Sequence, residues 1–83
     1  MRYSLRIEVC LKPMHNDPEG ETTEHLLREL GYDVESVKIG KIYSMIVKAI
    51  SKDEAKIKAE EMCKRLLANP TKDDYAVAIE EAK

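Results

Sequence analysis

The stretch Ala59-Glu60-Glu61-Met62-Cys63-Lys64-Arg65-Leu66-Leu67-Ala68-Asn69-Pro70 decides how this chain folds. Small and apolar side chains recur here and just before it at spacings of three and four residues, namely Ala55, Ala59, Met62, Cys63, Leu66 and Leu67. This spacing predicts an amphipathic helix with one apolar face. Ser51 and Asp53 are alternative N-caps, Asn69 is suited to a left-handed cap, and Pro70 forbids continuation of the helix. The other elements are then expected to form the sheet that this helix covers.

Length and charge narrow the class of protein. The chain has 83 residues, which leaves room for a single domain over residues 1–83 with a thin core. Its 14 basic and 16 acidic residues give a net charge of −2 and form no basic block, which disfavours nucleic acid as the main ligand. No apolar run approaches the length of a membrane span, and Met1-Arg2 leads into a strand pattern without a signal-peptide core. We therefore expect no membrane partner and a cytoplasmic location.

The first third of the chain predicts a strand followed by a helix. Apolar residues alternate with mostly polar ones from Tyr3 to Leu11, which is the two-residue period of a strand. Asp17 can cap a following helix with Pro18 at its first position, and Gly31 fits a helix end that needs positive φ. The inner stripe of this helix is expected to be Thr22, Thr23, Leu26, Leu27 and Leu30. A glycine at position 20 is costly inside a helix, so either something approaches its backbone closely or the helix begins one residue later.

The remainder predicts three more strands around the long helix. Residues 32–39 form a weaker strand suited to an edge, and Gly40 makes a tight reversal into a strand over residues 41–50. A last short strand spans residues 75–79. With right-handed crossovers, the order strand, helix, strand, strand, helix, strand gives an α+β ferredoxin-like split β-α-β sandwich (βαββαβ). Its antiparallel sheet would carry both helices on one face, with the first and third strands central.

The third predicted strand is apolar on both faces. Tyr43, Met45 and Val47 lie on one side, and Ile42, Ile46 and Ile50 lie on the other. Helices would cover only one of these faces, so the second needs another cover. We therefore infer a homo-oligomer, a dimer or a tetramer, that packs sheet against sheet or extends the sheet.

Catalytic signatures do not occur in the sequence. It contains no Gly-rich phosphate loop, no nucleophile and base pair, and no metal-ligand spacing. Ile39-Gly40-Lys41 is best interpreted as a hairpin turn followed by a solvated lysine. Residue patterns alone therefore predict an assembly module with no catalytic residue, no bound cofactor and no metal.

Several short motifs together resemble one known family. They are Leu11-Lys12-Pro13, Asp17-Pro18-Glu19-Gly20, Leu30-Gly31-Tyr32, Ile39-Gly40-Lys41 and above all Met62 to Pro70 with Tyr75. In this order and spacing they resemble PurS, the small subunit of bacterial and archaeal formylglycinamide ribonucleotide amidotransferase, also called phosphoribosylformylglycinamidine (FGAM) synthase. The resemblance spans nearly the whole chain.

This resemblance implies a function in de novo purine biosynthesis. The family's complex is an ATP-dependent ligase that uses ATP, Mg and glutamine to convert formylglycinamide ribonucleotide to its amidine. The implied partners are the synthetase PurL and the glutaminase PurQ, which PurS bridges while supporting ammonia transfer between them. The match and the residue chemistry together suggest partner or assembly contacts at Asp17, Gly20, Gly40, Lys41, Leu67, Asn69 and Pro70, each with a cap or turn function as the alternative. Gly40 and Lys41 would then form a protruding hairpin.

Two other hypotheses remain. The first is a small-molecule-sensing regulatory module of ferredoxin-like shape, which would need a pocket at a strand-helix loop or a dimer seam. The second is an acylphosphatase-like hydrolase, which needs an anion-cradling loop with an arginine after the first strand. Lys12-Pro13-Met14-His15-Asn16 supplies no such loop.

Overall fold

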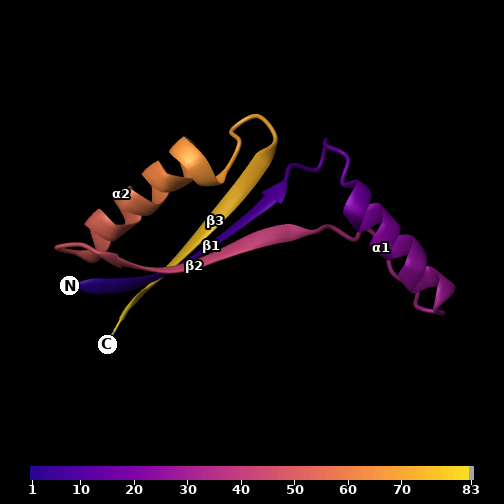
Figure 1. Ribbon diagram of the computed structural model, residues 1–83, viewed down its shortest axis with the longest axis horizontal. Helices are drawn as coiled ribbons and strands as arrows, with labels where there is room; N and C mark the ends of the chain where they lie inside the picture. Colours follow the sequence, from indigo (N-terminus) through magenta and orange to yellow (C-terminus); the bar gives the residue numbers. More distant parts are fainter. Residues whose placement is uncertain (83) are drawn as a thin grey trace.

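Three antiparallel strands form a single sheet in which the first strand is central. In the computed structural model, which describes residues 1–82, the order is β1 (Arg2–Leu11), α1 (Pro18–Glu29), β2 (Gly40–Lys48), α2 (Lys52–Met62), a π-helical turn η1 (Cys63–Leu67) and β3 (Asp73–Glu81). The sheet order is β2-β1-β3, so both neighbours of β1 come from later in the chain (Figure 1). The predicted α+β, ferredoxin-like class with an antiparallel sheet is confirmed.

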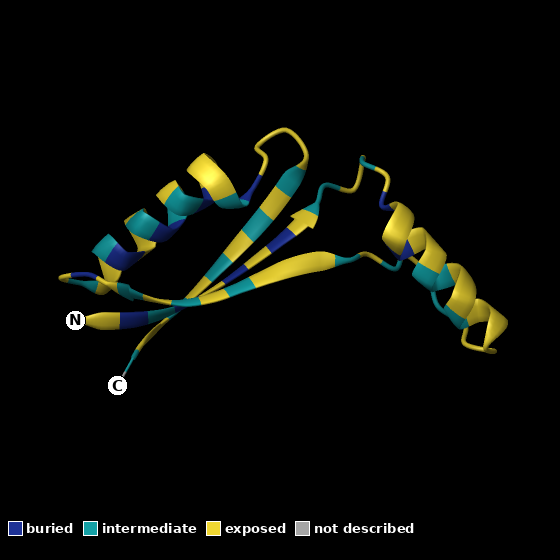
Figure 2. Ribbon diagram, viewed as in Figure 1, coloured by how far each residue is buried: buried dark blue, intermediate teal, exposed yellow. Residues whose placement is uncertain are grey.

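The core lies between β1 and α2. Ile7 of β1 stands opposite Tyr43 of β2 and Val77 of β3, and it is fully buried together with Leu5. The buried residues of β1 alternate with exposed ones, as the two-residue period predicts (Figure 2). One face of the sheet therefore carries the core, and the other faces outward.

Helix α2 covers the sheet as its spacing predicts. Ser51 is its N-cap, with Oγ accepting a hydrogen bond from the Glu54 N–H at 3.1 Å. Ala55, Ala59 and Cys63 are completely buried against the strands. The small side chains let the helix approach the sheet closely, and the Cys63 thiol packs as a small hydrophobe.

The end of this helix differs from the prediction. The last turn widens into η1, where the Ala68 N–H donates to the Cys63 carbonyl at 2.9 Å. Asn69 does not adopt the predicted left-handed cap, because Gly31 and Ser36 are the positive-φ residues of the described chain. The chain leaves the π turn at Ala68, whose backbone is extended with a φ of −126°, so the helix ends without a left-handed residue.

Helix α1 lies beyond the end of the sheet instead of over its face (Figure 1). Its bounds agree with the prediction, since Asp17 is the N-cap, Pro18 is the first residue and Gly31 has a φ of +99°. Its predicted inner stripe, however, is not covered by the sheet. Leu26 is 52% exposed and Leu30 is 74% exposed. The single chain therefore carries one helix, not two, on the inner face of its sheet.

Residues 34–39, here called the strap, are extended but do not form the predicted second strand. Side chains of α1 take the backbone groups that a strand would pair: Glu24 accepts from the Val37 N–H at 3.1 Å, and the Arg28 Nε donates to the Val34 carbonyl at 3.0 Å. Ser36 also has a φ of +53°, which interrupts a strand. Because the strap does not pair with β2, the third predicted strand becomes an edge strand and is not central.

The chain is extended for its length. Its radius of gyration is 16.1 Å and its dimensions are 50 × 29 × 13 Å, whereas a compact domain of this length has a radius of gyration of about 12 Å. The accessible surface of 6451 Å² also exceeds the roughly 5,000 Å² of a compact monomer of this mass. Across residues 1–82, no helix combines the length and apolarity required to cross a membrane.

Candidate functional site

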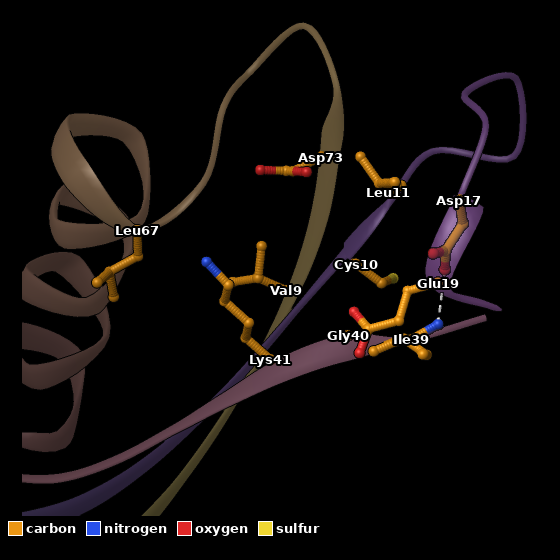
Figure 3. Close-up of a pocket in the computed structure, with 10 residues that line it drawn as sticks. All are labelled: Val9, Cys10, Leu11, Asp17, Glu19, Ile39, Gly40, Lys41, Leu67 and Asp73. Carbon is orange, nitrogen blue, oxygen red and sulfur yellow. Dashed lines mark hydrogen bonds between the residues drawn. The ribbon is translucent and has the colours of Figure 1, made fainter. Parts of the chain in front are cut away.

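A hollow of about 340 Å³ lies where β1 ends and α1 and β2 begin (Figure 3). It contains four of the seven residues that the sequence singles out: Asp17, Gly40, Lys41 and Leu67. Its other lining residues are Val9, Cys10, Leu11, Glu19, Ile39 and Asp73. Segments that are far apart in the sequence therefore meet at one end of the sheet.

Asp17 fastens the start of α1 to the strap. Its Oδ1 accepts from the Gly20 N–H at 2.9 Å, and its Oδ2 accepts from the Ile39 N–H at 2.8 Å. These two N–H donors hold the pKa of the Asp17 carboxyl below its ordinary value, and the Ile39 N–H has the larger effect. Asp17 is therefore ionised at neutral pH. Its side chain is buried, and both carboxylate oxygens are already hydrogen-bonded within the chain. Asp17 is therefore a positioning group at this site.

Gly20 lies inside α1, one turn after its cap. A Cβ placed there would lie 2.5 Å from the Val37 carbonyl oxygen and 2.8 Å from Asp17 Oδ2. The close backbone approach that its position in a helix suggests is therefore confirmed, and the approaching group is the strap. The alternative, in which the helix begins after Gly20, is wrong.

Gly40 and Lys41 begin β2 and do not form the predicted hairpin. Gly40 stands opposite Cys10 in the register, and a Cβ there would lie 2.8 Å from the Val9 carbonyl oxygen. Glycine is needed here for the close approach of β1, not for a reversal. Lys41 follows it with an exposed side chain that projects into the hollow (Figure 3).

Leu67, Asn69 and Pro70 shape the connection from η1 to β3. Leu67 is partly buried against the core and lines the hollow. The Asn69 Oδ1 accepts from the Thr71 N–H at 2.9 Å, and the Asn69 N–H donates to Asp73 Oδ2 at 2.8 Å. Asn69 and Pro70 thus belong to the turn and do not line the hollow.

Sequence reasoning missed Glu19 and Asp73 as lining residues. Glu19 is in the first turn of α1, where a carboxylate favours the helix N-terminus, and its sequence context gave no other signal. Asp73 precedes the predicted strand over residues 75–79, whereas in the structure it begins β3 and its Oδ2 accepts from the Asn69 N–H. With Asp17 they give the hollow three carboxylates against the single ammonium of Lys41.

The hollow combines apolar walls with charged side chains at its margins. Among residues 1–82, no three His, Cys, Asp or Glu side chains are placed to hold a metal ion. A reactive carboxylate needs a free oxygen or a raised pKa, and Asp17 has neither. The hollow is an open recess with apolar walls and charged margins, which a side chain of a partner can fill.

Comparisons with known proteins agree on one family. The family model described as "PurS: Phosphoribosylformylglycinamidine (FGAM) synthase" matches residues 4–81. The PurS subunit of Bacillus subtilis is 34% identical over 80 residues, which cover 95% of this chain and 94% of the relative.

Solved structures give the same result. The crystal structure of Thermus thermophilus PurS superposes with a TM-score of 0.89 at 37% identity and covers 100% of both chains. A chain in the structure of PurLQS from Thermotoga maritima has a TM-score of 0.90 at 32% identity, covering 96% of this chain and 99% of that one. The match thus extends over the sheet, both helices and the hollow, and the chain belongs to the PurS family of phosphoribosylformylglycinamidine synthase subunits.

Proposed function

We propose that this chain is the small subunit of an FGAM synthase, in which it joins the synthetase PurL to the glutaminase PurQ. The observation that carries this proposal is the similarity of 96% of the chain to a chain in the Thermotoga maritima PurLQS structure. In the proposed complex the partners carry out glutamine hydrolysis and ATP-dependent amidine formation in de novo purine biosynthesis. This chain would hold them together and secure ammonia transfer.

The single domain proposed for residues 1–83 would act as a homo-oligomer. Leu26 and Leu30 of α1 and Ile42 and Ile46 of β2 are about half exposed or more. Exposed apolar surface of this kind favours association. The large radius of gyration supports the same proposal, since a second copy can fill the space between the sheet and α1.

The hollow is the proposed contact with a partner subunit. Asp17 and Gly20 would fix the start of α1, Gly40 would fix the start of β2, and Asn69 and Pro70 would fix the turn before β3. Lys41 and Leu67 are then the side chains that meet the partner directly. Lys41 would pair with a carboxylate of the partner, the carboxylates of Glu19 and Asp73 would pair with its cations, and the apolar wall would contact an apolar side chain.

ATP, Mg and glutamine would be used by the partner subunits. The carboxylates near the hollow do not form a metal cluster in the described chain, and Asp17 is occupied by backbone donors. We propose a cytoplasmic location for the complex, since purine precursors are made there.

The direct test uses PurL and PurQ from the same source. Glutamine-dependent amidotransfer is measured with and without this chain, alongside the ammonia-dependent reaction of PurL alone. We expect only the glutamine-dependent rate to require this chain. If neither rate changes and no complex forms on size exclusion, the proposal is overturned, and thermal stabilisation by small molecules would instead favour the sensing module.

A matched pair of variants tests the hollow. Lys41→Glu adds a fourth carboxylate to the hollow, whereas Lys64→Glu makes the same charge change on the exposed side of η1. We expect Lys41→Glu to weaken the complex and lower the glutamine-dependent rate, while Lys64→Glu leaves both near wild type. Equal effects of the two variants would show that the hollow is not the contact.

A further inference from the structure

The outer edge of β3 is an unpaired sheet edge, and a groove lies between it and α2. Two end bonds of the sheet, Ala82 N–H to the Arg2 carbonyl at 2.9 Å and Lys12 N–H to the Lys72 carbonyl at 2.7 Å, show that even-numbered residues of β3 bond to β1. Because hydrogen-bonded and non-bonded positions alternate in an antiparallel pair, Tyr75, Val77 and Ile79 direct their N–H and C=O groups outward.

The groove that flanks this edge has a polar wall and an apolar floor. Lys52, Lys56 and Glu60 follow one another at four-residue spacing on the flank of α2, and Tyr75, Val77 and Ile79 lie below them. The groove encloses about 290 Å³. At one end the Tyr75 hydroxyl donates to Glu60 Oε2 at 2.6 Å, which holds this carboxylate at that end. The ammonium groups of Lys52 and Lys56 outnumber the single carboxylate of Glu60, so the groove is positive overall.

At the opposite edge of the sheet, side chains of α2 bond to backbone groups at the end of β2. The Lys58 ammonium donates to the Lys48 carbonyl of β2 at 2.9 Å, and the Ile50 N–H just beyond donates to Glu54. Within residues 1–82 no side chain bonds in this way to the outward groups of Tyr75, Val77 or Ile79. These bonds cap only the end of the β2 edge, and within residues 1–82 the outward groups of Ile42, Ser44 and Ile46 carry no side-chain bond either. What distinguishes the β3 edge is the groove with Lys52 and Lys56 beside it.

We propose that the β3 edge binds an extended segment of a partner protein, which adds a strand to the sheet. The residues of that segment opposite Val77 and Ile79 would point toward Lys56 and Lys52 and would be acidic. Those opposite Asp74 and Glu80 would point to the other face of the sheet and would be basic. Main-chain bonds supply the affinity, and this alternation of charge supplies the specificity.

A second copy of this chain does not fit the same edge. Pairing β3 with β3 along its whole length, centred on Val77, places Asp74 against Glu80 and Asp73 against Glu81, each twice. Strand β2 has no acidic residue to offer Lys52 and Lys56. The charge pattern thus disfavours pairing of two β3 strands along their whole length and favours a different polypeptide at this edge.

The test measures the binding of two synthetic peptides to the full-length protein. Each peptide has the length of β3. One peptide carries Glu opposite Val77 and Ile79 and Lys opposite Asp74 and Glu80, with Thr and Val elsewhere; in the control peptide the Glu and Lys positions are exchanged. We expect the first peptide to bind about tenfold more tightly. In amide hydrogen exchange, adding the first peptide should increase the protection of Val77 and Ile79, whereas the protection of Ile42 and Ile46 of the β2 edge should not change.

Three variants locate the binding. Lys52→Glu together with Lys56→Glu should remove or reverse the preference between the peptides while leaving the circular dichroism spectrum unchanged. Val77→Pro deletes an outward N–H without breaking a bond to β1 and should abolish binding, whereas Ile46→Pro, the matched change on β2, should not. The proposal is overturned if neither peptide binds, if both bind equally, or if the protected amides lie on β2.

Discussion

Gly20→Ala should loosen the strap against α1 although alanine is the better helix former. In an ordinary helix this substitution stabilises by up to about 1 kcal/mol. Here the new methyl group would lie 2.5 Å from the Val37 carbonyl oxygen and 2.8 Å from Asp17 Oδ2, and neither atom belongs to a freely moving side chain end. The net effect on stability therefore depends on which hydrogen bonds of the strap are strained when it moves to make room for the methyl group.

The expected magnitude follows from these contacts. Overpacking at a site that cannot yield costs about 1–3 kcal/mol. The upper part of that range applies, because moving the strap would strain the bonds from the Val37 and Ile39 N–H groups to α1 side chains. After subtraction of the helix-propensity gain, we expect the strap to be destabilised against α1 by about 2 kcal/mol.

Native-state amide hydrogen exchange is the suitable assay because it measures local opening. A loss of about 2 kcal/mol should make the Val37 and Ile39 amides exchange about 30-fold faster. The β1 amides, which belong to the core, should change little. Protein concentration must be kept equal, since self-association would alter apparent stability.

Thr22→Ala is the matched control, because it places alanine in the same helix at an exposed position. It should stabilise α1 by a few tenths of a kcal/mol and slow exchange slightly. If Gly20→Ala slows exchange as Thr22→Ala does, then the strap does not press on Gly20 and the account of α1 and the strap as one unit is refuted.

Three further predictions concern other groups. The Ile39 and Gly20 N–H groups lower the pKa of Asp17 below 3.8, so the folded chain binds this proton less readily than the unfolded one; the difference in melting temperature between wild type and Asp17→Asn should be constant above pH 3.8 and shrink below it, and a difference that persists in acid would contradict this. The Glu60 carboxylate raises the pKa of Tyr75 above 10.0, so the hydrogen bond between them should contribute its full stability below pH 10. The stability difference between wild type and Tyr75→Phe should therefore be constant below pH 10 and disappear as the pH rises through the raised pKa. In absorbance titration, the most alkaline tyrosine transition of the wild type should be missing from this variant. Leu5→Ala should lower the free energy of unfolding by about 2–5 kcal/mol in urea titration, and a loss below about 1 kcal/mol would mean that Leu5 is not part of the core.

The best-predicted elements are those whose pattern is set by burial on one face. The alternation from Tyr3 to Leu11 and the spacing of Ala55, Ala59 and Cys63 both reflect contact with the same core, so β1 and α2 were predicted correctly. The N-caps could also be predicted from the sequence, because Asp17 and Ser51 accept hydrogen bonds from residues only three positions further along the chain.

The strap could not be predicted in the same way. Its state is decided by Asp17, Glu24 and Arg28, which take its backbone groups from a distance of several residues or more along the chain. Nothing in the alternation of residues 32–39 reveals this competition. The wrong prediction for residues 32–39 also led to a wrong prediction for Gly40. A hairpin was expected there because a strand was expected on either side of it. Single residues of the site were predicted from the sequence. That they lie around one hollow could not be predicted, because it depends on the path of the strap.

The remaining apolar and unpaired surfaces of the chain are spatially separate, which has a consequence for assembly. Helix α1 lies beyond one end of the sheet (Figure 1), and it carries the exposed Leu26 and Leu30. The β3 edge and its lysine groove lie beside α2. The hollow with Lys41 lies between α1 and η1. The proposed assembly with further copies and two partners would use such separation, because surfaces that share no residues can be occupied together. Substitutions at Leu30, Lys41 and Lys56 should therefore act additively on complex formation, whereas overlapping interfaces would make one of them mask another.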